Sequence, residues 1–490
     1  MSYGFAFFIT VLTVLLSFIP ARAFLLKDQA VTFAEFNYVN AIATSMSHAY
    51  FATTEGIIRY NKMERRWELP LTGSDGLPRE EIKKVWVDTF DDRLYAQTGF
   101  SLYEYDMTFD RWYPLNELPE FNTNDRHIRR DEPLIPPFSF NYLGDGSLVD
   151  PFARTYPISD IVDDRSGTLW IGTWGYGPAT APSTSTLVEL LPYGLLQNRV
   201  NAVFLDDSLL WVSGAVTTGS RTGISVYNTL KNSFFYVESG LRSDFPAYDI
   251  NCLEGNQSNI YAGTEYGVYV LDKKSLQIVD YYNRRRGLVD NNVISLKSVG
   301  DSLFIGTASG LAMVSHEGDS LKIIQPKFFF NQVIYDIARA GSFLWLGTSI
   351  GAYRYSLETG RLQQFSDPKM FVSGDVYSIE PYGDFIWFAS DEGVLRLNTA
   401  TGETESFREF TNRLQSRALA VNDRICAIAS DKGMTFIFHD RDKPFSREFT
   451  IDDGLPSNYV YELVLDGDYI WVGTDKGLTR FWWNNPNRVD

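Results

Sequence analysis

The stretch Tyr469-Ile-Trp-Val-Gly-Thr-Asp-Lys-Gly-Leu478 decides the fold, because the chain repeats it. Near-copies read Leu344-Trp-Leu-Gly-Thr-Ser-Ile-Gly351, Leu303-Phe-Ile-Gly-Thr-Ala-Ser-Gly310 and Leu169-Trp-Ile-Gly-Thr173. Repetition at a period of about 42 residues indicates one supersecondary unit used many times rather than a set of unrelated domains.

Each repeat has the pattern of four short strands. The first strand has apolar residues at spaced positions, as in Val376-Tyr-Ser-Ile379, and a turn rich in Asp, Gly and Ser follows it. The quoted stretch supplies the second strand, a Gly begins the third, and the fourth carries aromatic residues, as in Asn232-Ser-Phe-Phe-Tyr236. Four short antiparallel strands per repeat predict the blade of a β-propeller. Helical periodicity is nearly absent, which argues against an all-α repeat array.

Alignment on the second strand gives ten repeats. Their second strands lie near Tyr50, Tyr95, Trp170, Trp211, Tyr261, Phe304, Trp345, Trp387, Ala427 and Trp471. We interpret this aromatic row as core packing between stacked sheets rather than as a ligand platform, because it lies on a strand with apolar neighbours and recurs. The following Gly-Thr is expected to be structural as well: Gly allows close approach between sheets, and Thr suits a strand end.

The two ends of the chain predict how the propeller closes. The last repeat stops after its third strand, Gly477-Leu-Thr-Arg-Phe-Trp482, whereas a spare strand, Val31-Thr-Phe-Ala-Glu-Phe36, precedes the first repeat. The N-terminal strand is therefore expected to complete the last blade and remove open sheet edges. We predict an all-β fold, a single propeller of ten four-stranded blades over residues 24–490; two smaller propellers, with two closure points, are the alternative. Deletion of residues 24–37 is predicted to lower the melting temperature sharply.

One interval breaks the rhythm between the second and third repeats. Residues 115–155 add about thirty residues to the usual spacing, with a Pro-rich stretch and a hairpin pattern over Phe138–Val149. A tolerated surface insertion or a degenerate blade is one interpretation. A partner-binding arm is the other, because long loops on rigid scaffolds often carry function.

The N-terminal residues have the pattern of an export signal. The apolar run Phe5–Ile19 is followed by Ala21-Arg22-Ala23, which predicts a signal peptide over residues 1–23 that is cleaved after Ala23. An uncleaved anchor is the alternative, because the first four residues carry no Lys or Arg. No later apolar run is long enough to cross a membrane. We expect an exported protein, placed in the periplasm, at the cell surface or outside the cell.

Charge and cysteine content exclude some partners and bonds. The formal net charge is −17, and an acidic surface repels phosphate backbones, so nucleic acid is not an expected partner. The negative net charge is explained either by solubility or by a cationic partner or a bound metal ion. Cys252 and Cys426 lie four repeats apart, too far for a disulfide in a ring, and are read as two buried thiols.

The repeat resembles that of the two-component regulator propeller family. Asp164-Arg-Ser-Gly-Thr-Leu-Trp-Ile-Gly-Thr173 matches the hairpin of that pattern, and Ile470-Trp-Val-Gly-Thr-Asp-Lys-Gly-Leu478 matches its second part. The resemblance spans residues 30–483. It implies a β-propeller; propellers of this kind are often periplasmic sensing halves of hybrid histidine kinases, frequently for glycans, and stand-alone relatives resemble surface or secretion-associated binding proteins. Because no kinase pattern is present, a stand-alone exported member without a kinase is expected, and no catalytic residue is implied.

Motifs for catalysis or cofactors are absent from the sequence. It contains no P-loop, dinucleotide fingerprint, zincin motif or Gly-x-Ser-x-Gly elbow. The four histidines are scattered without metal-ligand spacing, so neither a metal site nor a cofactor is predicted. Paired carboxylates for glycoside chemistry stay open as a possibility, because such pairs converge in space and not in sequence.

Loops that converge on one face of a propeller are the expected ligand surface. The candidate binding residues are Trp174, Tyr176, Arg284, Arg285, Arg286 and Asp290, with Arg126, Arg129 and Arg130 in the insertion. An Arg run is also common in a solvated loop, and the two aromatic residues suit either stacking on a sugar or packing on the insertion.

Three functions follow from these patterns. The first is a non-catalytic exported scaffold that binds a protein or a glycan, as a component of a cell-surface or envelope assembly. The second is a glycan-active hydrolase or lyase with carboxylates at the channel mouth. The third is a periplasmic sensor that acts with a separate kinase.

Overall fold

The computed structural model describes residues 30–107, 110–123, 125–215, 221–240, 245–246, 248–315, 321–323, 331–366, 374–411 and 418–486. The regular structure in these residues is almost entirely β-strand, and the short helical elements are α2 (Arg408–Thr411) and the 3-10 turns η1 (Gly73–Asp75), η2 (Arg284–Arg286) and η4 (Ile451–Asp453). The signal peptide expected over residues 1–23 lies outside the described residues. Within those ranges, no helix has the length and apolarity that a membrane crossing needs.

The first three repeats form three antiparallel sheets, which we call the three-sheet unit. Two of them have four strands and the third has seven, with β10 paired to one end of β13. Their strands are β2 (Val39–Thr44), β3 (His48–Thr53), β4 (Ile57–Asn61), β5 (Arg66–Trp67); β6 (Lys84–Val87), β7 (Leu94–Gln97), β8 (Leu102–Asp106), β9 (Arg111–Leu115); and β10 (Arg126–His127), β11 (Asn141–Leu143), β12 (Ser147–Val149), β13 (Thr155–Asp163), β14 (Thr168–Thr173), β15 (Pro178–Pro182), β16 (Glu189–Leu190).

The other seven repeats form seven four-stranded sheets, which we call the ring. Six are continuous in sequence: β17 (Val200–Asp206), β18 (Leu209–Gly214), β19 (Thr222–Asn228), β20 (Ser233–Ser239); β21 (Ile250–Gly255), β22 (Asn259–Thr264), β23 (Gly267–Asp272), β24 (Ile278–Tyr282); β25 (Val293–Val299), β26 (Ser302–Thr307), β27 (Gly310–Ser315), β28 (Leu321–Ile323); β29 (Ile334–Ala340), β30 (Phe343–Thr348), β31 (Gly351–Ser356), β32 (Leu362–Gln364); β33 (Val376–Tyr382), β34 (Phe385–Ser390), β35 (Gly393–Asn398), β36 (Thr404–Ser406); and β37 (Leu419–Val421), β38 (Ile425–Ser430), β39 (Gly433–Phe438), β40 (Phe445–Phe449). The seventh contains β41 (Val460–Asp466), β42 (Tyr469–Thr474), β43 (Gly477–Trp482) and β1 (Ala30–Phe33).

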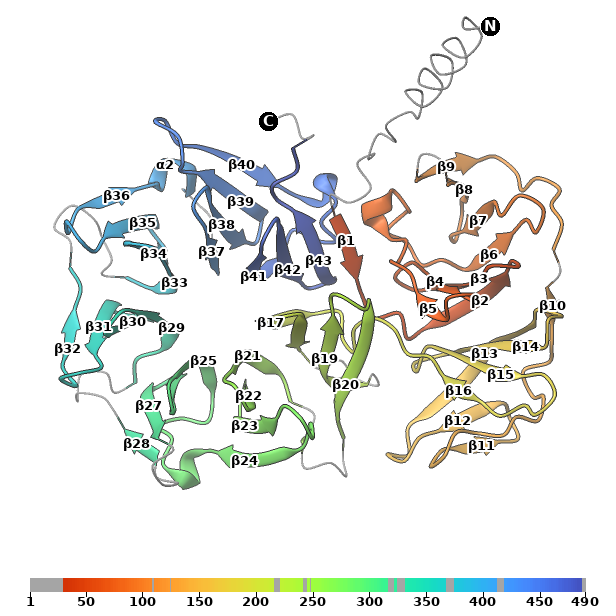
Figure 1. The fold of residues 1–490 in the computed structure, drawn as a ribbon, viewed down its shortest axis with the longest axis horizontal. Helices are drawn as coiled ribbons and strands as arrows, with labels where there is room; N and C mark the ends of the chain where they lie inside the picture. Colours follow the sequence, from red (N-terminus) through yellow and green to blue (C-terminus); the bar gives the residue numbers. More distant parts are fainter. Residues whose placement is uncertain are drawn as a thin grey trace, which may run out of the picture.

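The arrangement of the sheets differs from the single ring of ten that the even spacing predicts. The inner strands β17, β21, β25, β29, β33, β37 and β41 contact one another in this order, and β41 returns to β17 (Figure 1). In the three-sheet unit, β2 contacts both β6 and β13. The first strand of the fourth repeat therefore packs against the last repeat rather than continuing from the third. The alternative of two smaller propellers is met only in part: seven sheets follow one another around a ring, whereas the other three are joined through β2, which contacts β6 and β13.

The N-terminal strand pairs with the last repeat, as expected from the two chain ends. β1 runs antiparallel to β43, with Ala30 opposite Phe481 and Phe33 opposite Leu478. The hydroxyl groups of Thr32 and Thr479 lie 2.9 Å apart in the buried interior. The chain thus begins in the ring, passes through the whole three-sheet unit and then returns to the ring at β17.

The repeated residues pack as predicted. The nine aromatic residues of the second-strand register are all at most 4% exposed, which confirms them as core. A Cβ added to Gly347 would lie 2.5 Å from the carbonyl oxygen of Val376 on the next sheet, so only Gly fits there. The hydroxyl of Thr348 donates to the carbonyl of Gly351 at 2.7 Å and closes the hairpin between the second and third strands. Gly and Thr therefore set the spacing of sheets and the shape of the turn.

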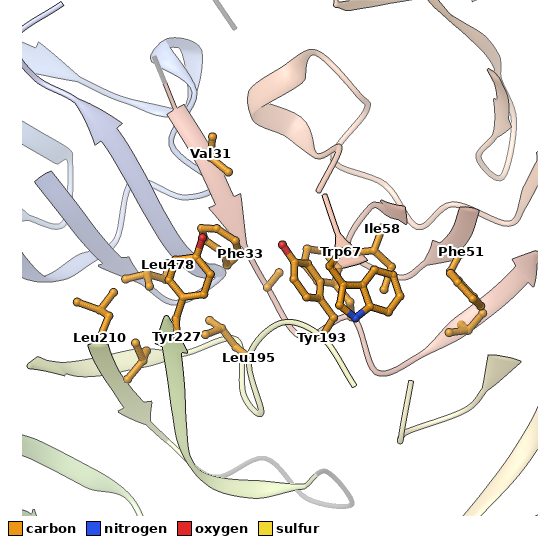
Figure 2. Close-up of a cluster of buried hydrophobic side chains, with 14 of the residues drawn as sticks. Val31, Phe33, Phe51, Ile58, Trp67, Tyr193, Leu195, Leu210, Tyr227 and Leu478 are labelled. Carbon is orange, nitrogen blue, oxygen red and sulfur yellow. The ribbon is translucent and has the colours of Figure 1, made fainter. Parts of the chain in front are cut away.

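A shared hydrophobic core joins the ring to the three-sheet unit. It contains residues from β1, from the three-sheet unit, from the segment between β16 and β17, and from the first and last sheets of the ring (Figure 2). Phe33 on β1 lies 4.6 Å from Tyr227 of the ring, and Tyr193 stacks on Trp67 of the three-sheet unit at 5.0 Å, centroid to centroid. Buried aromatic side chains each contribute about 2–3 kcal/mol, so this core holds the two bodies in one arrangement.

The long interval between the second and third repeats covers sheet faces that no neighbouring sheet covers. Phe121 packs on Trp86 and Tyr95 of the second sheet, with ring centroids 6.5 and 6.0 Å apart. Leu134 belongs to the buried cluster on the third sheet, and the expected hairpin is present as β11 and β12. Much of this interval is therefore packed against the three-sheet unit, although the Phe138 side chain is 99% exposed.

Candidate functional site

The ring encloses a cavity along its axis. All seven inner strands, or the residues next to them, contribute to its lining, and its volume is about 570 Å³. Small-molecule sites in proteins are concave and commonly have volumes of roughly 300–1,000 Å³. The cavity is thus large enough for a small organic ligand, and the exposed Arg339 in its lining shows that it opens to solvent.

Six charged side chains line this cavity, and five of them, all except Arg339, lie at two register positions of the inner strands. Glu254, Lys297 and Glu380 each lie opposite the core aromatic residue of the second strand. Asp336 and Glu462 lie two positions earlier, opposite Gly347 and Gly473. A register shift after the first residue of each of the inner strands β21, β25, β29, β33 and β41 precedes these positions. Four carboxyl groups and one ammonium group thereby face one space.

Two of the four carboxyl groups have partners. The Lys297 Nζ donates to Glu254 at 3.2 Å. Asp336 accepts hydrogen bonds from the backbone N–H groups of Ile337 and Ile379, both at 2.7 Å. These contacts lower the cost of burying the two charges.

The other two carboxyl groups are poorly compensated. Burial, together with the charge of Asp336, raises the pKa of Glu380 to about 8, and burial also raises the pKa of Glu462 to about 8 despite a hydrogen bond from the Leu463 N–H. The charge of Asp336 raises the pKa of both glutamates, and the charge of Glu380 raises that of Glu462, so the three groups are near enough to interact. Near neutral pH these two glutamates are therefore mainly protonated.

The arginine run of the fifth repeat forms an exposed turn outside this cavity. Arg284, Arg285 and Arg286 make up η2, whose first N–H group donates to Asn291. Arg286 donates to Asp280 and stacks over Tyr282. Asp290 does not accept from the Arg run: it accepts from the backbone of Asn292 at 3.0 Å and from Ser309 at 2.7 Å. Although burial opposes the shift, these hydrogen bonds hold the pKa of Asp290 below its usual value.

The aromatic pair Trp174 and Tyr176 lies at a different place, on the loop between β14 and β15 of the three-sheet unit. Trp174 packs edge-on against Tyr38 at 5.1 Å and is 42% exposed. Tyr176 packs against Phe140 of the insertion at 5.6 Å, centroid to centroid. The Arg221 guanidinium of the ring lies over the face of Tyr176, 4.0 Å from the centroid. Tyr176 therefore packs between the three-sheet unit and the ring.

Arg221 is the centre of a buried polar network between the ring and the three-sheet unit. This side chain is 1% exposed and binds Glu238 of β20 at 2.5 Å. Arg154 of the three-sheet unit reaches the same Glu238 at 2.8 Å and Asp150 at 2.6 Å. Although burial opposes the shift, the two guanidinium groups hold the pKa of Glu238 below its usual value. The network therefore fixes the two bodies through ionised groups.

The arginines of the insertion are exposed and separate from both groups. Arg126 is in β10 opposite Asp163, Arg129 pairs with Asp131 at 2.7 Å, and the backbone carbonyl of Arg130 accepts from Tyr142 at 3.5 Å. The candidate residues chosen from sequence are thus spread over three places. The cavity residues were not singled out, because each is one polar residue within an apolar strand pattern.

The Asp164 turn in the third sheet has a structural role. Its carboxylate accepts from the backbone N–H of Ser166 at 2.9 Å, from the Trp170 indole N–H at 3.0 Å and from Lys62 at 2.9 Å. Burial opposes the shift, but these donors lower the pKa of Asp164 to about 2. The Asp of this hairpin therefore closes the turn and anchors the core Trp.

Comparisons with known proteins agree with this fold. The family model described as "Two component regulator propeller" matches residues 154–175, which contain this turn and β14. No curated protein matches the sequence. PorZ, a bacterial surface component of the type-IX secretion system of Porphyromonas gingivalis, has a similar structure, with a TM-score of 0.50 and 15% identity over 91% of this chain and 74% of that chain.

Two extracellular domains from B. thetaiotaomicron are also similar. The domain of the putative hybrid two component system BT3049 has a TM-score of 0.47 and 16% identity, over 92% of this chain and 68% of that chain. The domain of the putative one component system BT4673 has a TM-score of 0.45 and 15% identity, over 92% and 70%. The family match over residues 154–175 and the repeat pattern agree: this part of the chain is similar to the two component regulator propeller family.

Proposed function

We propose that this protein is an exported, non-catalytic scaffold that holds a protein partner on the three-sheet unit. A place at the cell surface or in an envelope assembly, as is described for PorZ, is part of the proposal. The shared hydrophobic core and the Arg221 network give the scaffold a fixed shape, which suits a binding surface that must not rearrange. A glycan is the alternative partner.

An exposed apolar surface on the three-sheet unit carries the proposal. Its members are Ile135, Phe138 and Leu187, which are 53%, 99% and 51% exposed. Ile135 and Leu187 are adjacent through a parallel bridge, and Pro137, Phe138 and Leu187 line one hollow with a volume of about 530 Å³. Exposed apolar groups that surround a hollow are typical of protein-binding sites rather than of inert surface.

Comparative capture tests this surface. The mature protein is immobilised, native envelope extract is passed over it, and bound proteins are quantified by mass spectrometry. Phe138→Ser together with Leu187→Ser should remove a defined set of captured proteins. Phe100→Ser, which changes a side chain that is 98% exposed elsewhere, should leave the set intact. Equal capture by all three proteins would refute a partner at this surface, and capture of glycan alone would favour the alternative.

A glycan-active enzyme is the second candidate, because the cavity contains carboxyl groups in different protonation states. Glu380 and Glu462 are suited to proton donation at neutral pH, whereas burial raises the pKa of Asp336 and two backbone hydrogen bonds oppose that shift. Reducing-end release from a polysaccharide panel tests this function. Turnover that is lost in Glu380→Gln would establish the enzyme and overturn the non-catalytic assignment.

A further inference from the structure

The axial cavity of the ring contains more negative groups than the protein itself compensates. Glu254 is paired with Lys297, and the backbone partners of Asp336 satisfy that carboxylate. Glu380 accepts no hydrogen bond from any side chain or backbone group that the structure describes, although its side chain is partly buried in the cavity wall. A buried carboxyl group without a partner is costly, so a ligand that supplies the missing donor would be bound favourably.

The fold does not require a carboxyl group at these positions. At the register of Glu380, four other inner strands carry Phe204, Ala338, Ala420 and Val464. These residues lie opposite Trp211, Trp345, Ala427 and Trp471, in that order. Apolar side chains thus satisfy this register elsewhere in the same ring. Glu380 makes the ring more costly to assemble and adds no internal contact, which points to a role toward the cavity contents.

The residues that line the axial cavity suit an organic molecule better than a bare metal ion. Among the described residues, no group of three or more His, Cys, Asp or Glu side chains is arranged to hold a metal ion. The carboxyl groups come from β29, β33 and β41, so they surround the cavity rather than meeting at one point. Tyr335 and Tyr377, whose ring centroids lie 5.1 Å apart, add aromatic faces to the lining, and aromatic faces attract organic cations.

We propose that the axial cavity binds a small organic cation with two or more protonated amines, held by Glu380, Glu462 and Asp336. The site is separate from the apolar surface of the three-sheet unit, and it stands whether or not that surface holds a partner. The amine nitrogens would donate the hydrogen bonds that Glu380 and Glu462 lack, and the charges on ligand and protein would cancel in a space of low dielectric.

Binding in this site is coupled to protons. The titratable groups that face Glu380 across the cavity are Cys252, Glu254, Lys297, Asp336, Arg339 and Glu462, with Tyr335 and Tyr377 at the same lining. Because Glu380 and Glu462 have pKa values of about 8 in the empty cavity, an incoming cation must displace their protons below that pH. Its affinity should rise by up to about tenfold per pH unit for each carboxyl group that loses its proton, and level off above pH 8.

Calorimetric titration of the mature protein with spermidine and with putrescine tests the proposal, at pH 6, 7, 8 and 9 and in two buffers with different ionisation heats. Saturable binding that tightens at least tenfold between pH 6 and 8, with protons released to the buffer, is expected. Glu380→Gln with Glu462→Gln should weaken spermidine at least tenfold. Glu403→Gln, which alters an exposed carboxylate of the same ring, is the matched control and should bind as the parent does.

Two results would contradict binding of an organic cation in the axial cavity. Equal spermidine affinity in the double variant and the parent would place any binding on the acidic surface and overturn the proposal. Mg²⁺ or Ca²⁺ that displaces spermidine at equal concentration would identify a divalent-ion site instead. The Gln substitutions keep the shape of the side chain and remove a buried charge, so the thermal melting of each variant at pH 8 shows directly that loss of binding is not loss of fold.

Discussion

The guanidinium carbon of Arg221 lies 4.0 Å from the ring centroid of Tyr176, and this contact joins the ring to the three-sheet unit. Arg221 also lies over the ring of Tyr236, 5.0 Å from its centroid, and is ionically bound to Glu238. A buried guanidinium that is both stacked and paired fixes position and orientation together. Arg221 therefore acts together with the shared hydrophobic core in placing the two bodies relative to each other.

Replacement of Arg221 by Leu should release the two bodies from each other. The loss leaves Glu238 buried with only Arg154 as its partner, and breaking a buried pair costs about 3–5 kcal/mol. We expect a lower melting temperature and faster proteolysis between residues 190 and 200. Arg129→Leu removes an exposed ion pair of the insertion and is the control. Identical proteolysis of both variants would show that the hydrophobic core alone holds the junction.

Phe33→Ala tests closure of the ring by the N-terminal strand. Phe33 is fully buried and packs on Tyr227, Phe234 and Trp471. Truncation of a buried Phe typically costs about 3–5 kcal/mol, so chemical denaturation should show a matching loss of unfolding free energy. Phe90→Ala, at a position that is 89% exposed, should change stability by less than about 0.5 kcal/mol. Similar losses in the two variants would contradict closure through β1.

Gly347→Ala tests the distance between neighbouring sheets. The added methyl group would meet the carbonyl oxygen of Val376 at 2.5 Å, and a backbone atom cannot move aside cheaply. Overpacking of this kind costs about 1–3 kcal/mol. Gly374→Ala, where the added atom meets nothing within 4 Å, serves as control. The melting temperatures of the two variants give the comparison, and an unaffected Gly347→Ala protein would show that sheet spacing is adjustable.

The cavity glutamates predict how stability depends on pH. The pKa of Glu380 and of Glu462 is raised to about 8 in the folded protein from an unfolded value of 4.5. A carboxyl group with a raised folded pKa favours the folded state below pH 4.5, and this contribution is lost as the pH rises toward 8. Glu380→Gln should therefore raise the melting temperature at pH 8 and change it little at pH 4.5. A uniform effect across this range would contradict the raised pKa.

The sequence pattern predicts the local structure well because the repeat residues act within one sheet or between adjacent sheets. Trp345 needs only its neighbouring sheet, Thr348 needs only its own hairpin, and both appear as expected. The number of sheets in a ring depends instead on contacts between distant strands, such as β17 with β41. A repeat pattern does not determine which two sheets come into contact to close the ring.

The cavity residues escaped prediction for a related reason. Glu254, Asp336, Glu380 and Glu462 each occupy a single polar position in an apolar strand, a pattern that also fits a solvated strand edge. Only the ring brings them to one axis. Once the strand register is known, their position opposite a core aromatic residue or a Gly of the second strand identifies them as cavity residues.

The order of strands along the chain also has a consequence for biosynthesis. β1 precedes the other nine sheets in the chain, and its partner β43 follows them. During synthesis β1 therefore stays unpaired until these sheets and β43 have been translated. A molecule that stops before Gly477 has no strand to receive β1, and its final sheet stays open at the edge. A chain that lacks β43 therefore leaves β1 without its pairing strand, and an open strand edge invites pairing with other chains.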